Sequence, residues 1–437
     1  MRSLVAALLL SLLAARASAD YALRGTLVTP DQVIENGVLL IHDTKIVAAG
    51  TNIAIPPQAI VIDTHGYVYP GLIDLHNHVT WNAHARWHPP QLTRNRYEWQ
   101  AMPEYKAALD TPHRHIPEAN LCDLERFGEV KALVGGVTSI TGSLAKDCSR
   151  GLVRNLDFAS GLGKELQYRV FPFELAPDVE NGVRDALRAG TAVIMHLAEG
   201  ADPSSRRELA MARAHQYLTP NTIIVHGVAL TEDDFRELGN TGVGFVWSPR
   251  SNIELYGQTA DVAAAKKYVT MAIAPDWSPS GSSGMIGELR YAAEWNAKQT
   301  TPVFTSRELV QMATSNAARL AHIADKVGRL EPGMYADYVV IRREATDAYE
   351  ALIYAKPADV VVVAVNGRPL YGDEKLVSAI NPSANIEVVK DVCGRPKALD
   401  MTDSDNGKGT SFSDTINTLT SEFAKVNVPL AAVTECP

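Results

Sequence analysis

Between residues 70 and 325, short apolar runs alternate with longer polar stretches, and this alternation limits the fold more than any other feature of the chain. The apolar runs have the length of buried strands, and the stretches between them have helical character. Alternation over about 250 residues predicts an α/β fold in which parallel strands close into a (β/α)8 TIM barrel. A doubly wound open sheet is the main alternative, although the chain has neither a GxGxxG turn nor a P-loop. The clearest runs lie at 191–195, 222–225, 243–247 and 269–274, with helical stretches at 205–217 and 232–238.

Both sides of this region carry β-rich sequence. Short β-branched runs alternate with turns over residues 20–69, and the same sequence pattern occurs again at 326–375. Asn36-Gly37 and Asn366-Gly367 are typical of tight turns between paired strands. Because two such segments can pack face to face, we expect a small composite β-sandwich built from both flanks, with residues 70–325 inserted as the barrel.

The N-terminus has the pattern of a secretory signal peptide, residues 1–19. Arg2 precedes an apolar run of about a dozen residues, and Ala17-Ser18-Ala19 offers a small-residue cleavage site. The run is too short for a stable membrane span, and no later segment is long enough. We therefore expect a secreted or periplasmic protein without membrane insertion after cleavage. A buried N-terminal helix or an anchor is the alternative.

Four cysteines allow three pairings, and export permits disulfides. We favour Cys122–Cys148 and Cys393–Cys436, because each pair closes a local loop; four free thiols are the alternative. Residues 376–437 are expected to form a stabilising C-terminal extension with an amphipathic helix at 413–426.

Composition limits the partners. The formal net charge of −9 argues against nucleic acid or an anionic membrane surface. Hydrophobic residues make up 46% of the chain, which is enough for a sizeable core. We expect a small-molecule substrate, and a homo-oligomer is left open.

Histidines end several of the apolar runs. His76 and His78 follow the buried run 72–75, and residues two apart along a strand point to the same side. These two imidazoles can therefore reach one metal ion. His196 ends another run, with Glu199 three residues later.

Two more runs end in the same way, at His226 and at Asp276. The carboxyl ends of barrel strands converge on one face, where catalytic groups collect. Imidazoles and a carboxylate with one position left for water are typical of a catalytic metal site. Such donors favour Zn2+, with Fe2+ as an alternative.

These motifs resemble the amidohydrolase superfamily over residues 55–370, and within it the mononuclear cytosine/guanine/triazine deaminase-like branch. The likeness is carried by the HxH run 70–78, by Pro249-Arg250-Ser251-Asn252 and by the barrel-to-sandwich junction at 328–337. The spacing of His196 and Glu199, together with His226 and Asp276, also agrees with that branch. The resemblance implies one metal ion bound by His76, His78, His196 and Asp276.

It also implies that Glu199 moves protons, and that His226 and Asp276 direct the attacking water. The eighth-strand motif here is Ala-Pro-Asp-Trp-Ser rather than the usual Thr-Asp-Gly. Lys146 is the nearest candidate for a lysine bridging two metals, but its surroundings read as a loop.

The expected activity is that of an exported metal-dependent hydrolase that cleaves a non-peptide C–N bond in a small cyclic or heterocyclic amine or amide. A cyclic-amide or dipeptide-type amidohydrolase and a non-catalytic ligand-binding barrel are the alternatives. The long insertion after His78 is rich in aromatic residues and arginines, which could wall a planar or anionic ligand or simply close the barrel. Its candidates are Trp81, Arg86, Trp87, Arg94, Arg96, Tyr97 and Trp99, and Arg250 is a further anion-binding candidate.

Overall fold

The computed structural model describes residues 20–143, 148, 151–158, 160–382, 384–404 and 408–436. The predicted signal peptide and Lys146 lie outside these residues. The predicted mixed α/β class is confirmed, since parallel strands alternate with helices through the middle of the chain.

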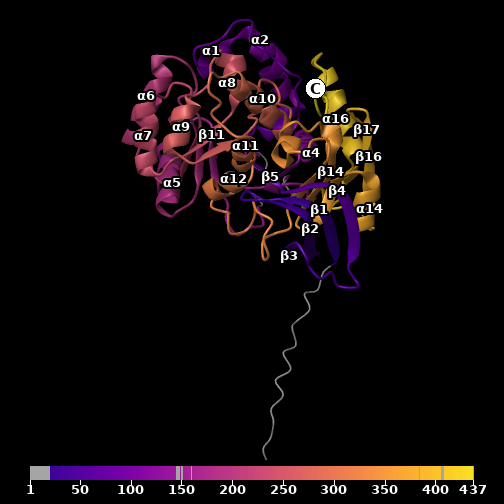
Figure 1. The fold of residues 1–437 in the computed structure, drawn as a ribbon. Helices are drawn as coiled ribbons and strands as arrows, with labels where there is room; N and C mark the ends of the chain where they lie inside the picture. The colour runs from indigo at the N-terminus through magenta and orange to yellow at the C-terminus, as the bar shows by residue number, and fades with distance from the viewer. Residues whose placement is uncertain are drawn as a thin grey trace, which may run out of the picture.

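Parallel strands form the centre of the molecule (Figure 1). They are hydrogen-bonded as a three-stranded sheet, β5-β6-β7, and a five-stranded sheet, β8 to β12. The backbone N–H of Leu166 donates to the carbonyl of Leu156 at 3.0 Å across the β7–β8 junction, and a parallel bridge pairs Asn77 with Asp276 across the β12–β5 junction. These contacts join the two sheets into one ring of strands. The strands are β5 (Leu72–Asp74), β6 (Val137–Ile140), β7 (Arg154–Asn155), β8 (Gln167–Arg169), β9 (Val193–Leu197), β10 (Thr222–His226), β11 (Gly244–Trp247) and β12 (Met271–Ile273).

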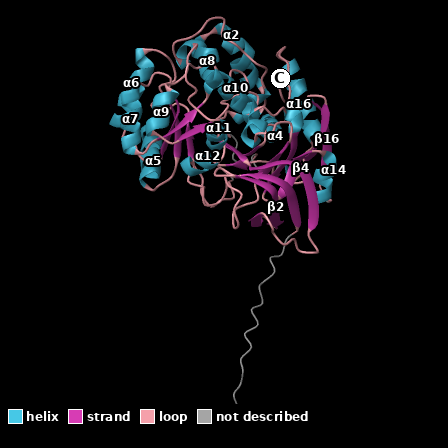
Figure 2. Ribbon diagram, viewed as in Figure 1, coloured by secondary structure: helices cyan, strands magenta, loops and turns pink. Residues whose placement is uncertain are grey.

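Burial explains why most of these strands are continuously apolar in sequence. Every residue of β9, β10, β11 and β12 is buried, because side chains on one face fill the ring and those on the other meet helices. Figure 2 shows the helices outside the strands. They are α4 (Leu121–Val134), α5 (Pro177–Arg188), α6 (Pro203–Ala214), α7 (Glu232–Thr241), α8 (Pro249–Tyr256), α9 (Val262–Tyr268), α10 (Met285–Ala297), α11 (Ser306–Met312) and α12 (Ser315–Leu320).

The two flanks pair as one β unit, as their shared sequence style predicts. Strand β4 pairs in parallel with β1 and antiparallel with β13, so N- and C-terminal strands meet in one nine-stranded sheet. Figure 1 shows the indigo strands of the first flank beside the orange and yellow strands of the second. Its strands are β1 (Tyr21–Val28), β2 (Val33–His42), β3 (Lys45–Gly50), β4 (Ile60–Pro70), β13 (Tyr338–Arg342), β14 (Val360–Val365), β15 (Arg368–Gly372), β16 (Ile386–Val392) and β17 (Arg395–Asp400).

One of the two expected turns is wrong. Asn366-Gly367 joins β14 to β15 with φ of 56° and 72°, as predicted. Asn36-Gly37 instead lies inside β2, where the β1–β2 register shifts and the φ of Asn36 is 52°. A β-bulge and a tight turn both favour residues that tolerate positive φ, so the dipeptide alone does not separate them.

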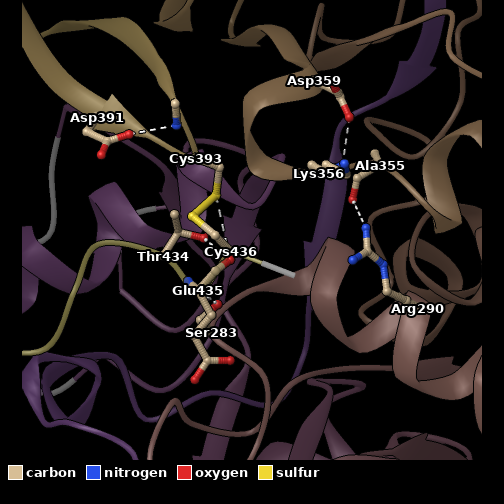
Figure 3. The surroundings of a disulfide bond; sticks show 11 residues. Ser283, Arg290, Ala355, Lys356, Asp359, Asp391, Cys393, Thr434, Glu435 and Cys436 are labelled. Atoms are coloured by element: carbon tan, nitrogen blue, oxygen red, sulfur yellow. Dashed lines mark hydrogen bonds between the residues drawn. A yellow bond between two sulfur atoms is a disulfide. The ribbon is translucent and has the colours of Figure 1, made fainter.

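The C-terminal extension is built into the molecule. It adds β16 and β17 to the sheet and helix α16 (Phe412–Ala424), which matches the expected amphipathic helix. Both favoured disulfides, Cys122–Cys148 and Cys393–Cys436, are present. Figure 3 shows Cys393–Cys436 next to Glu435, whose N–H donates to the Ser283 hydroxyl at 3.2 Å. Two shorter helices, α13 (Ala348–Ile353) and α14 (Glu374–Ile380), accompany the sheet.

A membrane-crossing helix is not found in the part of the chain that the structure describes, because none of its helices combines the necessary length and apolar character.

Candidate metal centre and active site

Four strands deliver the candidate ligands to one end of the ring. His76 and His78 follow β5, His196 lies in β9, His226 ends β10 and Asp276 follows β12. Because parallel strands present their carboxyl ends on the same side, side chains at these positions converge.

The distances confirm this convergence. The Nε2 atoms of His76 and His78 each lie 3.2 Å from Asp276 Oδ1. Potential ligand atoms of His76, His78 and His196 lie within 4.8 Å of one another, and so do those of His76, His226 and Asp276. The structure therefore brings all five predicted ligand and water-directing residues into one small volume.

The backbone is unusual at these strand ends. His226 and Asp276 have φ of 72° and 68°, and Ala198 has φ of 54°. Residues with a Cβ seldom adopt this left-handed region, and such strain collects at functional sites. β10 and β12 thus turn sharply at the residue that points into the site, and the chain after β9 turns between His196 and Glu199.

Helix α8 orients the candidate ligands from behind. The Ser248 hydroxyl lies 2.7 Å from His76 Nδ1, and the Ser251 hydroxyl donates to Asp276 Oδ2 at 2.6 Å. Both serines are fully buried. Ser248 precedes the helix as its N-cap, yet its side chain makes no capping hydrogen bond and is free to serve His76.

The same helix reaches the two proposed proton-handling residues. Asn252 Oδ1 lies 2.9 Å from His226 Nδ1, and the Tyr256 hydroxyl donates to Glu199 Oε1 at 2.7 Å. An amide oxygen can only accept, so Asn252 favours a proton on His226 Nδ1, and in the neutral imidazole Nε2 is then the acceptor. Partners of this kind fix the tautomer and direction of groups around a metal.

The electrostatics favour neutral imidazoles. Burial, with His226 and His196 beside it, holds the pKa of His76 well below its ordinary value. Burial also lowers the pKa of His196 to about 3, although the adjacent Glu199 opposes the shift. Metal ligands must be deprotonated, so these histidines are prepared for coordination.

Orphaned nitrogen atoms also fit a metal. The Nε2 atoms of His76 and His226 are buried without a hydrogen-bond partner among the described residues. A buried polar atom normally has a partner, and a metal ion or a water bound between these two nitrogens would supply it. Neutral imidazoles, one carboxylate and open space beside them suit a catalytic zinc site.

Glu199 is a fully buried carboxylate beside this cluster. Its Oε2 lies 3.2 Å from His196 Nδ1 and 3.6 Å from His226 Nε2. Burial alone would raise the pKa of Glu199, but the hydrogen bond from His196 Nδ1 and the fixed positive charge of Arg96 outweigh burial and keep this pKa well below the ordinary value. The carboxylate is therefore charged and placed to exchange a proton with a bound molecule.

A cavity of about 510 Å³ opens above the cluster. His78, His196, Glu199 and Asp276 form its floor. The walls are mainly aromatic, and the mouth is polar. Its wall residues are Trp81, Trp99, Tyr105, Val170, Phe171 and Trp277, and its mouth residues are Gln100, Lys106, Asp110 and Arg114.

The insertion after His78 supplies much of this wall. Its helical elements are η1 (Val79–Ala83), α1 (Arg96–Ala101), α2 (Pro103–Tyr105), η2 (Lys106–Asp110) and α3 (Thr111–His115). Trp81 and Trp99 line the cavity as the aromatic pattern suggested, whereas Trp87 packs in the aromatic cluster behind it.

Three of the arginines proposed as anion-binding groups, Arg86, Arg94 and Arg250, do not line the cavity. Arg86 pairs with Glu435 at 2.7 Å, Arg94 pairs with Glu98, and Arg250 lies 3.3 Å from Glu435. These cations are neutralised by neighbouring carboxylates outside the cavity, which agrees with the alternative that this part of the insertion packs against the barrel.

Several residues of the site had no sequence signal that we recognised. The Tyr168 hydroxyl lies 3.1 Å from His196 Nε2, but its strand β8 has only three half-buried residues and shows no apolar run. Ser248 and Tyr256 become visible only once α8 is known to face the site. Trp277 adjoins Asp276, so its position in the wall could have been inferred from the neighbouring ligand.

Comparisons with known proteins show which family and fold this chain resembles. The model of the amidohydrolase family matches residues 171–370. A 5-methylthioadenosine/S-adenosylhomocysteine deaminase from Symbiobacterium thermophilum is 26% identical over 411 residues, covering 78% of this chain and 90% of that protein.

Solved structures resemble the fold across nearly the whole chain. A zinc-bound adenosine deaminase from Xanthomonas campestris superposes with a TM-score of 0.70 and 19% identity, covering 93% of this chain and 98% of that one. An atrazine chlorohydrolase variant from Arthrobacter aurescens, complexed with zinc and atraton, gives a TM-score of 0.69 and 17% identity, covering 92% and 100%. At these identities the likeness concerns the fold.

Proposed function

Because the chain belongs to the amidohydrolase superfamily, we propose that it is an exported zinc-dependent deaminase that removes an amino group from a planar heterocycle by cleaving a C–N bond. One observation carries this proposal: His76, His78, His196 and Asp276 converge from three strands of a (β/α)8 barrel, and the Nε2 atoms of His76 and the adjacent His226 are buried there without a hydrogen-bond partner among the described residues. These four residues would hold the ion.

Zinc bound there would act as a Lewis acid and lower the pKa of water towards neutrality. The unprotonated Nε2 of His226 and the Asp276 carboxylate orient the attacking water and accept its proton. Glu199, whose Oε2 lies 3.6 Å from His226 Nε2, takes up this proton and passes it to the substrate nitrogen that leaves as ammonia. Water is thereby added at the ring carbon as the C–N bond breaks.

The cavity supports a planar heterocyclic substrate. Trp81, Trp99 and Trp277 provide flat apolar faces above the floor, and aromatic rings favour stacked or edge-on contact with another ring. A volume of about 510 Å³ is typical of small-molecule sites. The named relatives deaminate adenine-containing compounds, so substituted purines are the first substrates to test.

Export is part of the same proposal. The signal-peptide pattern motivates it, and the two disulfides support it because cytosolic thiols are normally kept reduced.

The test combines metal analysis with an ammonia assay. Purified protein should contain close to one zinc per chain and release ammonia from at least one compound in a panel of purines, pyrimidines, triazines and cyclic amides. His76→Ala should lose both zinc and turnover, whereas His215→Ala, at the end of α6, should keep both. Ring opening without ammonia would favour a cyclic-amide hydrolase, and a folded protein that binds no metal would refute the proposal.

A further inference from the structure

Arg96 is a buried cation at the start of α1, in the insertion that forms the cavity wall. Its side chain is 2% exposed. One terminal nitrogen lies 3.5 Å from Glu199 Oε2 and donates to the Val170 carbonyl at 3.0 Å, and the other donates to Glu208 Oε1 at 3.1 Å. A buried arginine of α1 therefore contacts the loop after β8, the loop after β9 and helix α6.

Glu208, the second carboxylate partner of Arg96, stabilises the turn that precedes Glu199. Glu208, on α6, accepts a hydrogen bond from the Ala198 backbone N–H at 2.7 Å. Ala198 has left-handed backbone, with φ of 54°, and directly precedes Glu199. Arg96 thus contacts the Glu199 side chain directly and supports its backbone through Glu208.

Helix α1 reaches Glu199 by a second route. The Trp99 indole N–H donates to the Tyr256 hydroxyl at 2.9 Å, and this hydroxyl donates to Glu199 Oε1 at 2.7 Å. Trp99 also lines the cavity. One short helix therefore supplies the substrate wall and restrains both oxygens of the carboxylate.

We propose that Arg96 is a positioning residue for Glu199, so that the carboxylate is aimed at the substrate nitrogen only when α1 is seated on the barrel. The idea rests on the proposed function of Glu199. Without Arg96, the Oε2 atom would lose its only nearby cation of fixed charge among the described residues, and the turn at Ala198 would lose the support of Glu208. A displacement of about 1 Å at a reacting group can cost about 100-fold in rate.

The alternative explanation is that Arg96 has a purely structural role: it attaches the insertion to the barrel and does not act on Glu199. A double-mutant cycle separates the two, because a residue that acts through Glu199 loses its effect once Glu199 is gone. We would compare Arg96→Lys, Arg96→Met, Glu199→Gln and the Arg96→Lys/Glu199→Gln double variant as zinc-loaded proteins. Arg154→Lys is the matched control, because Arg154 is an equally buried arginine whose carboxylate partner, Asp337, lies outside the site.

Arg96→Lys should keep its zinc and nearly its KM, lose about 100-fold in kcat, and add no further loss to Glu199→Gln. Crystal structures of zinc-loaded Arg96→Met should show Glu199 moved from its wild-type position, with the histidine ligands in place. An equal kcat loss in both backgrounds, an equal loss in Arg154→Lys, or an unmoved Glu199 would overturn the inference. If the wild-type protein turns over nothing in the panel, the proposed function fails, and the position of Glu199 in the crystal structures still decides the role of Arg96.

Discussion

The Ser248→Ala substitution should remove the hydrogen bond between Ser248 and His76, a candidate metal ligand, and leave the other contacts of the site unchanged. Ser248 is fully buried, its hydroxyl lies 2.7 Å from His76 Nδ1, and its side chain does not cap α8. When His76 uses Nε2 for the metal, Nδ1 carries the proton and donates it to Ser248. The alanine variant leaves this buried N–H without its partner and the ring free to rotate.

The expected magnitude follows from that single contact. Loss of a hydrogen-bonded partner behind a metal-binding histidine typically weakens metal affinity about 10- to 100-fold. This corresponds to about 1.4–2.7 kcal/mol of binding free energy. We expect zinc to remain bound at micromolar protein concentration but to be surrendered to a chelator more readily.

The assay is competition for zinc against a chelator of known affinity, at fixed pH. Ser139→Ala is the matched control, because Ser139 is equally buried and its hydroxyl has no partner in the described part of the chain. An unchanged zinc dissociation constant in Ser248→Ala would refute the reasoning. An equal weakening in Ser139→Ala would show that any buried serine deletion loosens the site.

Three further predictions address catalysis and stability. Glu199→Gln should retain zinc but lose about 100- to 10,000-fold in kcat, the usual contribution of a proton-transferring side chain; an unchanged kcat would exclude Glu199 from that role. Replacing Cys393 and Cys436 together by serine should lower the free energy of unfolding, measured in urea, by about 4 kcal/mol, because the bond closes a separation of 43 residues; a loss below about 1 kcal/mol would contradict this. Burial lowers the pKa of Lys131 to about 7, whereas in the unfolded chain this pKa is about 10. Between these two pH values the unfolded chain binds one proton more than the native protein does. The free energy of unfolding should therefore rise with pH relative to that of Lys131→Met, by up to about 1.4 kcal/mol per pH unit. A difference that stays flat between pH 7.5 and 9.5 would show that Lys131 is not buried in its neutral form.

The candidate ligands were accessible from sequence because their signal is local. His196 and His226 each lie at the end of a continuous apolar run. Such a run is typical of a strand that is buried on both faces, so it can be recognised without knowledge of the rest of the fold. His76 and His78 add the two-residue spacing of a strand. Pairing of the flanking strands was also inferred, since both flanks have the short β-branched runs typical of sheet edges and turns.

Local sequence was insufficient where one residue preference serves two structures. Asn36-Gly37 allows positive φ in a turn or in a bulge, and only the register between β1 and β2 decides for the bulge. The aromatic and basic insertion posed the same difficulty. Trp81 and Trp99 line the cavity, whereas Arg86 pairs with Glu435, a carboxylate that lies far away in sequence.

By itself, the sequence determined the strand-end positions of the metal-binding candidates and the α/β class, because both depend on periodicity. The pairing of the cysteines was only favoured from sequence, and the structure decided it. The tertiary structure alone decided which partners aim those groups. Ser248 behind His76 and Arg96 beside Glu199 are separated from them by 172 and 103 residues, and contacts over such distances exist only after the barrel closes and α1 packs on its mouth. Packing of whole elements, which no local pattern records, therefore sets the direction and charge of the site.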